Sequence, residues 1–297
     1  MPAAHGNNAG ILKSGHDVRL LSRSNKCGNT SGLAPGYVQT NLIVLPSRYA
    51  SDFRLLCARN TVPCPLVAES ATPGHWGKIK SHLPGIDGET LAKGLDIRRD
   101  APKYNVYVDG KLHRQDCEDI VTEWTDDHVA FLIGCSFSFE TALADAGLTP
   151  THTARGRNVP MYRTTLPLCA AGVFRDSTYV VSMRSYPASE VERVRDITRP
   201  FASTHGEPVA WGWDALERLG IRDIDSPQWG DAPLAKIDGK PLSSFKNNEA
   251  EVPVFWGCGV TPQEAVMRAN LEGVVMAHSP GHMILLDTLD VETIRKF

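Results

Sequence analysis

The chain has 297 residues, of which 42% are hydrophobic and 22% are charged. This is ordinary globular usage, so a disordered chain, a coiled coil and a small disulfide scaffold are excluded. The formal net charge of -3 excludes the basic surface of a general nucleic-acid binder. No run of about 18 apolar residues is present, so no membrane span is predicted, and seven scattered cysteines without a CxxC pair indicate a reducing compartment.

Residues 1–27 differ in composition from the rest of the chain and are predicted to form an N-terminal extension. They are rich in Gly and Asn, and they lack the apolar core of a signal peptide. Four basic residues (Lys13, Arg19, Arg23 and Lys26) outnumber Asp17 there. We therefore expect a cytoplasmic protein whose chain starts with a frayed segment and a short helix, with a mitochondrial presequence as the alternative.

Short apolar runs punctuated by Gly and Pro follow the extension. A strand is predicted over about 37–44, and apolar residues at helical spacing after Pro46 predict a helix. Residues 63–95 show no clear period and are expected to be irregular. The alternating segment 103–113 contains Asp-Gly, which predicts a β-hairpin, and a short helix is expected to start within 119–124.

The middle of the chain contains two more pairs of a strand and a helix. The continuous apolar run 129–133 predicts a strand buried on both faces. Ser138 is expected to cap a helix that ends at Gly147. Segment 178–187 predicts another strand, with a helix over about 188–197.

The last third of the chain opens on 206–250, a second segment that is expected to be irregular. VPVFWGCGVTPQEAV then predicts a buried strand, a Gly-Cys-Gly turn and a helix. Thr261 is the expected N-cap of this helix, and Glu264 completes a capping box. A further apolar segment follows over about 274–288.

Two strand–turn–helix segments resemble one another. The two segments are FLIGCSFSFETAL (131–143) and VFWGCGVTPQEAV (254–266). In each, three apolar residues are followed by Gly-Cys, then by a Ser or Thr, and then by an acidic or amide residue in the first helical turn. A His follows each copy, His152 in one and His278 in the other. Duplication, convergence on one turn chemistry and chance are the possible origins. We infer two strand–turn–helix–strand units.

This repeat predicts the fold class, a two-lobed mixed α/β protein with an internal strand–turn–helix duplication. The two lobes are expected within one unit, 28–297, and to be discontinuous in sequence. A Gly-Cys turn that leads into a helix N-terminus presents free backbone N–H groups. Two such turns facing each other are expected to form a pocket for a small acidic molecule.

Several motifs together resemble the D-glutamate cyclase family, which includes bacterial hydro-lyases of the YcsI type. The motifs are GLAPGYVQTNLIVLP, PCPL, AFLIGCSFSFETAL, GRNVPMYRT, VVSMR and VPVFWGCGVTPQEAV with HSPGHM. They run from about Gly28 to Asp287 in the family's order. The resemblance implies a cofactor-free, two-lobed α/β lyase of amino acid metabolism that cyclises D-glutamate to 5-oxo-D-proline with loss of water. Residues 70–95 and 230–250 depart from the family pattern, which puts the substrate in doubt.

Such a reaction requires a base, an acid, oxyanion donors and a cation for the carboxylate. We expect His282 to be the general base because neutral imidazole accepts a proton near pH 7. His278 is either an alternative base or a substrate-binding support of the turn. Cys135 and Cys258, at predicted helix N-termini, are expected to have lowered thiol pKa values and to act as an acid–base pair. The alternative is that these thiols only fill space beside glycine.

Arginine is the expected ligand of the substrate carboxylate, since its guanidinium matches a carboxylate bidentately. Arg157 and Arg163 are the first choices, and Arg184 is a reserve. Ser136 is the expected oxyanion donor, ahead of Ser138. The remaining candidates are Asn158, Tyr162 and Thr261 as hydrogen-bonding groups, and Glu140 as an acid or a first-turn carboxylate. One face of the extended segment that contains Tyr37, Gln39 and Asn41 could also reach the pocket.

No GxGxxG, P-loop or GxSxG motif occurs, so we expect no cofactor. A metal at His278 and His282 is the less favoured reading, because no carboxylate lies in that motif. The expected partner is a small carboxylate or amino acid, with no nucleic acid and no membrane, and a homo-oligomer is left open. The alternatives are a specialised lyase, cyclase or epimerase of unknown substrate, or a non-catalytic carboxylate-binding protein.

Overall fold

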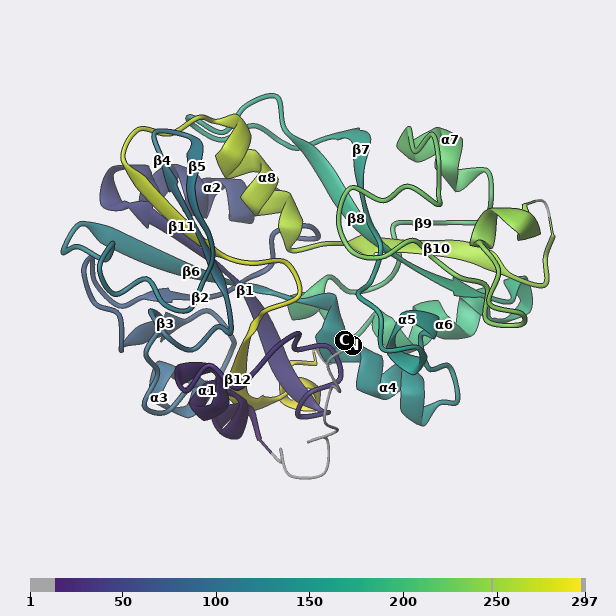
Figure 1. Ribbon diagram of the computed structural model, residues 1–297, viewed down its shortest axis with the longest axis horizontal. Helices are drawn as coiled ribbons and strands as arrows, with labels where there is room; N and C mark the ends of the chain where they lie inside the picture. Colours follow the sequence, from purple (N-terminus) through teal and green to yellow (C-terminus); the bar gives the residue numbers. More distant parts are fainter. Residues whose placement is uncertain (1–13, 247, 295–297) are drawn as a thin grey trace, which may run out of the picture.

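Two antiparallel sheets form the framework of the protein (Figure 1). The computed structural model describes residues 14–246 and 248–294. Sheet A has the order β3-β2-β6-β1-β11-β4-β5, with β12 also paired to β1, and sheet B has the order β7-β8-β10-β9. The mixed α/β class with two lobes is thus confirmed.

The strands of sheet A are β1 (Tyr37–Pro46), β2 (Leu66–Ser70), β3 (Ile79–Ser81), β4 (Tyr104–Val108), β5 (Lys111–Cys117), β6 (His128–Gly134), β11 (Val274–His278) and β12 (Ile284–Leu289). Those of sheet B are β7 (Met161–Pro167), β8 (Thr178–Tyr186), β9 (Ala210–Trp211) and β10 (Val252–Gly257). The α-helices are α1 (Gly15–Arg23), α2 (Ala50–Arg59), α3 (Gly88–Leu91), α4 (Glu140–Asp145), α5 (Thr151–Ala154), α6 (Val191–Thr198), α7 (Ala215–Leu219) and α8 (Val260–Arg268). Short 3-10 helices include η1 (Ser47–Tyr49), η2 (Ser136–Phe139), η3 (Ala188–Glu190) and η4 (Ala202–Thr204). None of these helices is long and apolar enough to cross a membrane.

Several predictions based on apolar periodicity and on turn residues are confirmed. Strand β6 is buried along its whole length. The predicted hairpin is β4 and β5, joined at Asp109 and Gly110, whose φ angles of 48° and 74° suit the Asp-Gly turn. The strand and helix expected over 178–197 are β8 and α6.

Three predictions of local structure are wrong. Residues 63–95 are not irregular throughout, because β2 pairs with β6 and buries Val67 and Ala68 in the core. Residues 119–124 form a turn and contain no helix. Segment 206–250 also contributes to a sheet, since β9 within it pairs with β10.

The duplication extends beyond the repeat visible in the sequence. Thr40 of β1 pairs with Gly134 of β6, and Val181 of β8 pairs with Gly257 of β10. The two glycines directly precede the aligned cysteines, so the register is the same in both sheets. After β1 the chain continues through η1 into α2, and after β8 it continues through η3 into α6. Each half is therefore a strand, a 3-10 turn, a helix and a returning strand.

Each sheet is covered by a helix that follows a strand of the other sheet. Helix α4 follows β6 of sheet A, but Phe139 and Leu143 pack with Val254 and Trp256 of sheet B. Helix α8 follows β10 of sheet B, but Ala265 and its neighbours pack on sheet A. Figure 1 shows α4 near α6, and α8 between β11 and β7. The Gly-Cys turns are thus the points where the chain crosses between the lobes.

Ser138 and Thr261 do not cap helices, contrary to prediction. The Ser138 hydroxyl accepts a hydrogen bond from the backbone N–H of Gln39 at 2.9 Å. The Thr261 hydroxyl accepts the Val180 N–H and donates to its carbonyl, both at 3.0 Å. Both residues lie inside helical turns and tie those turns to the neighbouring strand. Glu264 likewise pairs with Arg163 instead of closing a capping box.

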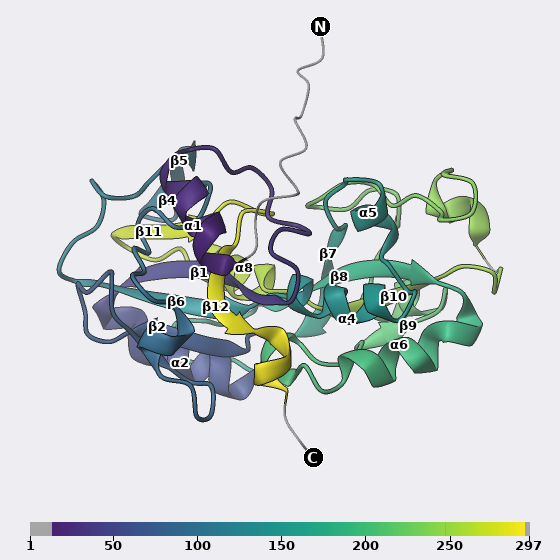
Figure 2. The ribbon, with the colours of Figure 1, turned by 90° about the horizontal axis from the view of Figure 1, so that it is seen from below.

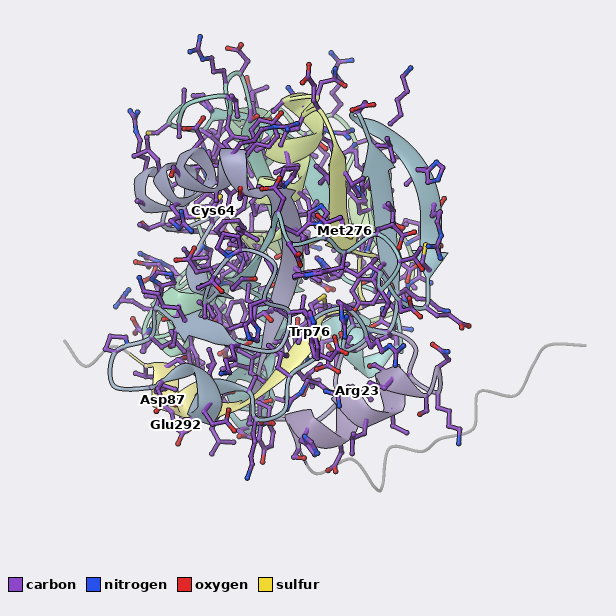
Figure 3. The ribbon with its side chains drawn as sticks, turned by 90° about the vertical axis from the view of Figure 1, so that its left-hand side faces the viewer. Arg23, Cys64, Trp76, Asp87, Met276 and Glu292 are labelled. Carbon is purple, nitrogen blue, oxygen red and sulfur yellow. The ribbon has the colours of Figure 1, made fainter. Side chains whose placement is uncertain are left out.

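Part of the predicted N-terminal extension is helix α1, which packs beside β12 (Figure 2). Buried Arg19 donates to the Leu285 carbonyl at 2.8 Å and pairs with Asp287. Arg23 pairs with Asp100 at 2.5 Å. Figure 3 looks onto this lobe, with Arg23 on α1 and Met276 in the core. The frayed start expected before this helix, with Lys13 of the alternative presequence, lies outside the described residues.

Candidate active site

The two crossing points are closely packed against residues of the opposite lobe. A Cβ at Gly134 would collide with the Ser203 carbonyl, and a Cβ at Gly259 would collide with the Asn41 side chain. Glycine is required at both places because backbone and side chains approach where a methyl group would be. The crossing is therefore a rigid centre at which both lobes meet.

The two thiols at the crossings are buried, and their pKa values are raised. Burial raises the pKa of Cys135 to about 12 and that of Cys258 to about 11. The amides of Phe137 and Val260 lie at these sulfurs and lower both pKa values, but burial outweighs them. The expected lowering of the thiol pKa is therefore wrong, and both cysteines are thiols at neutral pH.

A buried charged network lies beside the first crossing. The Arg184 Nε donates to Glu140 Oε1 at 2.9 Å, and its Nη2 donates to Ser136 Oγ at 3.0 Å. His152 Nε2 lies 3.1 Å from the same carboxylate. Burial alone would raise the pKa of Glu140, but its interactions with His152 and Arg184 lower it to about 2. Glu140 is consequently an anion at neutral pH rather than an acid.

A groove of about 890 Å³ opens between the lobes, at helices α2 and α6. Its walls include Cys57, the Pro-Cys-Pro-Leu segment 63–66 and the segment 202–209. Figure 3 labels Cys64 beside α2. The volume lies in the range of small-molecule sites. Three arginines and a single carboxylate, that of Glu207, line the groove, and each guanidinium is ion-paired with a neighbouring carboxylate.

His205 combines several features of a functional residue, and sequence reasoning missed it. It lines the groove, is 2% exposed, and has a φ of 88°, which is rare outside glycine. Its Nδ1 lies 2.8 Å from the Val62 carbonyl, so Nδ1 carries the proton, and Nε2 has no partner among the described residues. Burial, reinforced by the charge of Arg184, lowers its pKa to about 4. The imidazole is therefore neutral, with a free lone pair, at pH 7.

Two arginines occupy equivalent places on opposite helices of the groove. Arg54 is the fifth residue of α2, and Arg195 is the fifth residue of α6. Arg54 pairs with Glu69 at 2.5 Å, and Arg195 pairs with Glu207 at 3.0 Å. Each guanidinium also lies over an aromatic ring. The duplication thus places one oriented cation on each wall.

Comparison with known proteins identifies the family. The D-glutamate cyclase family model matches residues 129–287, more than half of the chain. A protein of Schizosaccharomyces pombe named "Putative hydro-lyase C5H10.01" is 46% identical over 91% of this chain and 80% of its own length. The "Putative hydro-lyase" of Rubrobacter xylanophilus is 43% identical over 92% of this chain and 94% of its own. The chain belongs to the D-glutamate cyclase family.

This membership confirms the resemblance of the motifs and places the chain among the lyases. Several of the family-like motifs are in contact with one another. Gly134 donates its N–H to the Pro65 carbonyl of the PCPL motif. Asn158 of the GRN motif lies beside Gly281 of the SPGH motif. The structure thus brings together segments that are far apart in the sequence.

Other candidates from the sequence lie apart from the groove. The Tyr162 hydroxyl donates to the Ile224 carbonyl within a core cluster of sheet B. Arg163 pairs with Glu264 at 2.6 Å and is 45% exposed. Arg157 donates to the Ala232 carbonyl and lines a cavity of about 20 Å³, room for a single water.

The two histidines near the C-terminus have separate roles in the packing. His278 Nδ1 accepts the Leu42 N–H at 3.1 Å, and His282 Nδ1 lies 3.1 Å from the Pro280 carbonyl. Burial lowers the pKa of His278 to about 4 and also lowers that of His282. His282 lines none of the four described cavities. Within residues 14–246 and 248–294, no cluster of three His, Cys, Asp or Glu side chains suits a metal.

The buried histidines predict a loss of stability in mild acid. Because the pKa of His278 falls from 6.5 unfolded to about 4 folded, the unfolded chain binds more protons between these values. The free energy of unfolding therefore decreases as pH falls through this window, by on the order of 2 kcal/mol at about pH 5 for this residue. Urea unfolding of His278→Asn at pH 8 and pH 5 is expected to show a smaller difference than the parent protein. Exposed His113→Asn is the control, and equal pH dependence in all three proteins would contradict the prediction.

Proposed function

We propose that the chain cyclises a glutamate-type amino dicarboxylic acid to its lactam with loss of water, in the groove between α2 and α6. The observation that carries this proposal is the pair Arg54 and Arg195, one on each wall of a groove that also contains His205. A molecule with a carboxylate at each end matches two cations related by the duplication. Family membership supports the same reaction class.

The reaction forms one N–C bond and breaks one C–O bond, with no oxidation or reduction. The ammonium of the substrate loses a proton to His205 Nε2, and the free amine then attacks the side-chain carboxyl carbon. The departing oxygen takes the proton back from the imidazolium and a second proton from the nitrogen, and leaves as water. D-glutamate would thus give 5-oxo-D-proline.

The surroundings of His205 suit this role. Its neutral state is maintained by burial and by the charge of Arg184. Binding of the substrate carboxylates would bring negative charge near the imidazole and make it a stronger base. Ser136 does not line the groove, so we propose that its hydroxyl positions Arg184 and does not bind the oxyanion directly. Cys135 and Cys258 are proposed only as neutral thiols at the crossing. For the other candidates, Arg157, Asn158 and His278, we propose support of the motifs that are in contact with one another.

Replacing either groove arginine is expected to weaken substrate binding more than it slows the bound reaction. Arg54→Gln and Arg195→Gln should each raise KM for D-glutamate by about 10-fold to 100-fold, since each removes a charged hydrogen-bonding partner worth roughly 1.5–3 kcal/mol. Turnover is followed by mass spectrometry as the loss of one water, with D- and L-glutamate assayed in parallel. Arg193→Gln is the matched control, because Arg193 lies on α6 and does not line the groove.

The assay also decides between the alternatives. Unchanged KM in both arginine variants would place the substrate elsewhere, even if turnover is observed. Thermal stabilisation by a dicarboxylate without any turnover would favour a carboxylate-binding protein. Exchange of the α-proton in deuterated water without loss of water would favour an epimerase.

A further inference from the structure

A second cavity, of about 240 Å³, lies beneath the loop 32–37 and shares no lining residue with the groove. Its other walls come from η2, α4 and the segment 149–153. The loop is anchored by the Gly36 N–H, which donates to the Thr141 hydroxyl at 3.0 Å. Ala34 within the loop has a φ of 42°, so a non-glycine residue is held in the left-handed region there.

The charge of this cavity is opposite to that of the groove. Among the residues that line the cavity, the charged ones are Glu140 and Asp145, and the lining contains no Lys, Arg or His. Glu140 Oε1 is engaged by Arg184 and His152, whereas Oε2 accepts the Thr153 hydroxyl, at 3.0 Å, and no other hydrogen bond from the described residues. A carboxylate oxygen accepts more than one hydrogen bond, so Oε2 keeps acceptor capacity.

Gln39 supplies an independent sign that the cavity receives a hydrogen-bond donor. Its side chain is 3% exposed and lines the cavity. The Nε2 group donates to the Thr30 carbonyl at 3.1 Å, which fixes the orientation of the amide. The Oε1 atom is buried and has no partner among the described residues. Buried amide oxygens in native proteins nearly always accept a hydrogen bond, from protein, ligand or water, so this oxygen has room for a donor that a ligand in the cavity would supply.

The remaining walls are mainly apolar. Leu33, Pro35, Phe137 and Pro150 line the cavity, together with Ala144 of α4. A ligand that fits all these surfaces has a donor-rich cationic head and a short hydrocarbon body. A carboxylate would meet two like charges, and a purely apolar molecule would leave Gln39 Oε1 without a donor.

We propose that this cavity binds a small organic ammonium ion. Its N–H groups donate to Gln39 Oε1 and to Glu140 Oε2, and its hydrocarbon part packs on Phe137 and the adjacent proline side chains. The site does not depend on the proposed cyclisation, because it lies outside the groove. Glu140 nevertheless links it to Arg184, and thereby to the surroundings of His205.

The probe for this site is n-butylammonium chloride, titrated into the full chain by isothermal calorimetry. We expect saturable binding that is at least about 10-fold tighter than binding of 1-butanol, and no binding of butyrate, since only the cation satisfies both acceptors. Gln39→Met keeps the side-chain volume but removes the acceptor, and Ala144→Leu fills the cavity from an exposed position on α4. Each variant should weaken binding at least about 10-fold, with an unchanged melting temperature as the test of folding.

The matched control is Gln228→Met, since Gln228 lines a different cavity. Binding should be retained in this control and in His205→Asn, so a failure of the cyclase proposal does not affect the result. Equal affinity for butylammonium and butanol would overturn the proposal. So would unchanged affinity in both Gln39→Met and Ala144→Leu, or binding that is lost in His205→Asn.

Discussion

His205→Asn is expected to lower turnover by at least about 100-fold while the protein stays folded, since a positioned general base contributes about 10²–10⁴ in rate. Asn tolerates the left-handed φ of 88° at this position. Its amide can also donate to the Val62 carbonyl in place of Nδ1, at the position of a bond that is now 2.8 Å. The variant therefore removes the free lone pair of Nε2 and retains the anchor of the side chain. The measurement is the rate of water loss from saturating D-glutamate.

The same assay on His282→Asn separates two candidate bases. Sequence reasoning favours His282, whereas the groove contains His205. A loss confined to His205→Asn would support the groove as the site of proton transfer. Full activity of His205→Asn, together with inactivity of His282→Asn, would place the chemistry at the SPGH turn and refute our assignment.

Arg184→Met is expected to lower the free energy of unfolding by about 3–5 kcal/mol, because it leaves the buried Glu140 carboxylate without its guanidinium partner. Arg184 is 2% exposed, and it also donates to Ser136 and Ser182. Urea denaturation at neutral pH measures the loss. The network around Arg184 is thus predicted to hold η2 and α4 against sheet B, as well as to lie near His205.

A double variant tests whether the loss comes from the stranded charge. When Arg184→Met is combined with Glu140→Gln, neither charge of the original pair remains, and the introduced amide oxygen can still accept from the Thr153 hydroxyl. The double variant should therefore be more stable than Arg184→Met alone. Additive losses from the two single substitutions would show that Arg184 and Glu140 act independently, contrary to the network described above.

Strands and tight turns were predictable from the sequence because their signals are local. The run 129–133, the Asp-Gly hairpin and the repeated Gly-Cys turns depend on residues adjacent in the chain. The motifs also indicated the family without any knowledge of the fold. The same patterns did not predict that α4 packs on sheet B and α8 on sheet A. An apolar helix face does not specify which sheet it covers.

The chemistry of individual side chains depended on contacts that no local pattern contains. Ser138 and Thr261 have the residue types of helix caps, yet their hydroxyls bond strands that precede them by 99 and 81 residues, at Gln39 and Val180. Cys135 lies at a helical turn, as predicted, but its burial between the lobes raises the thiol pKa to about 12.

The groove exists only in the assembled molecule, because its two walls come from the two halves of the duplication. Neighbouring residues in the chain encode periodicity and turn geometry, and these yielded the strands, the turns and the repeat. The burial of a side chain and the charges around it depend on contacts with residues that are distant in sequence. For that reason folding alone places Arg54 opposite Arg195 and keeps the His205 imidazole neutral.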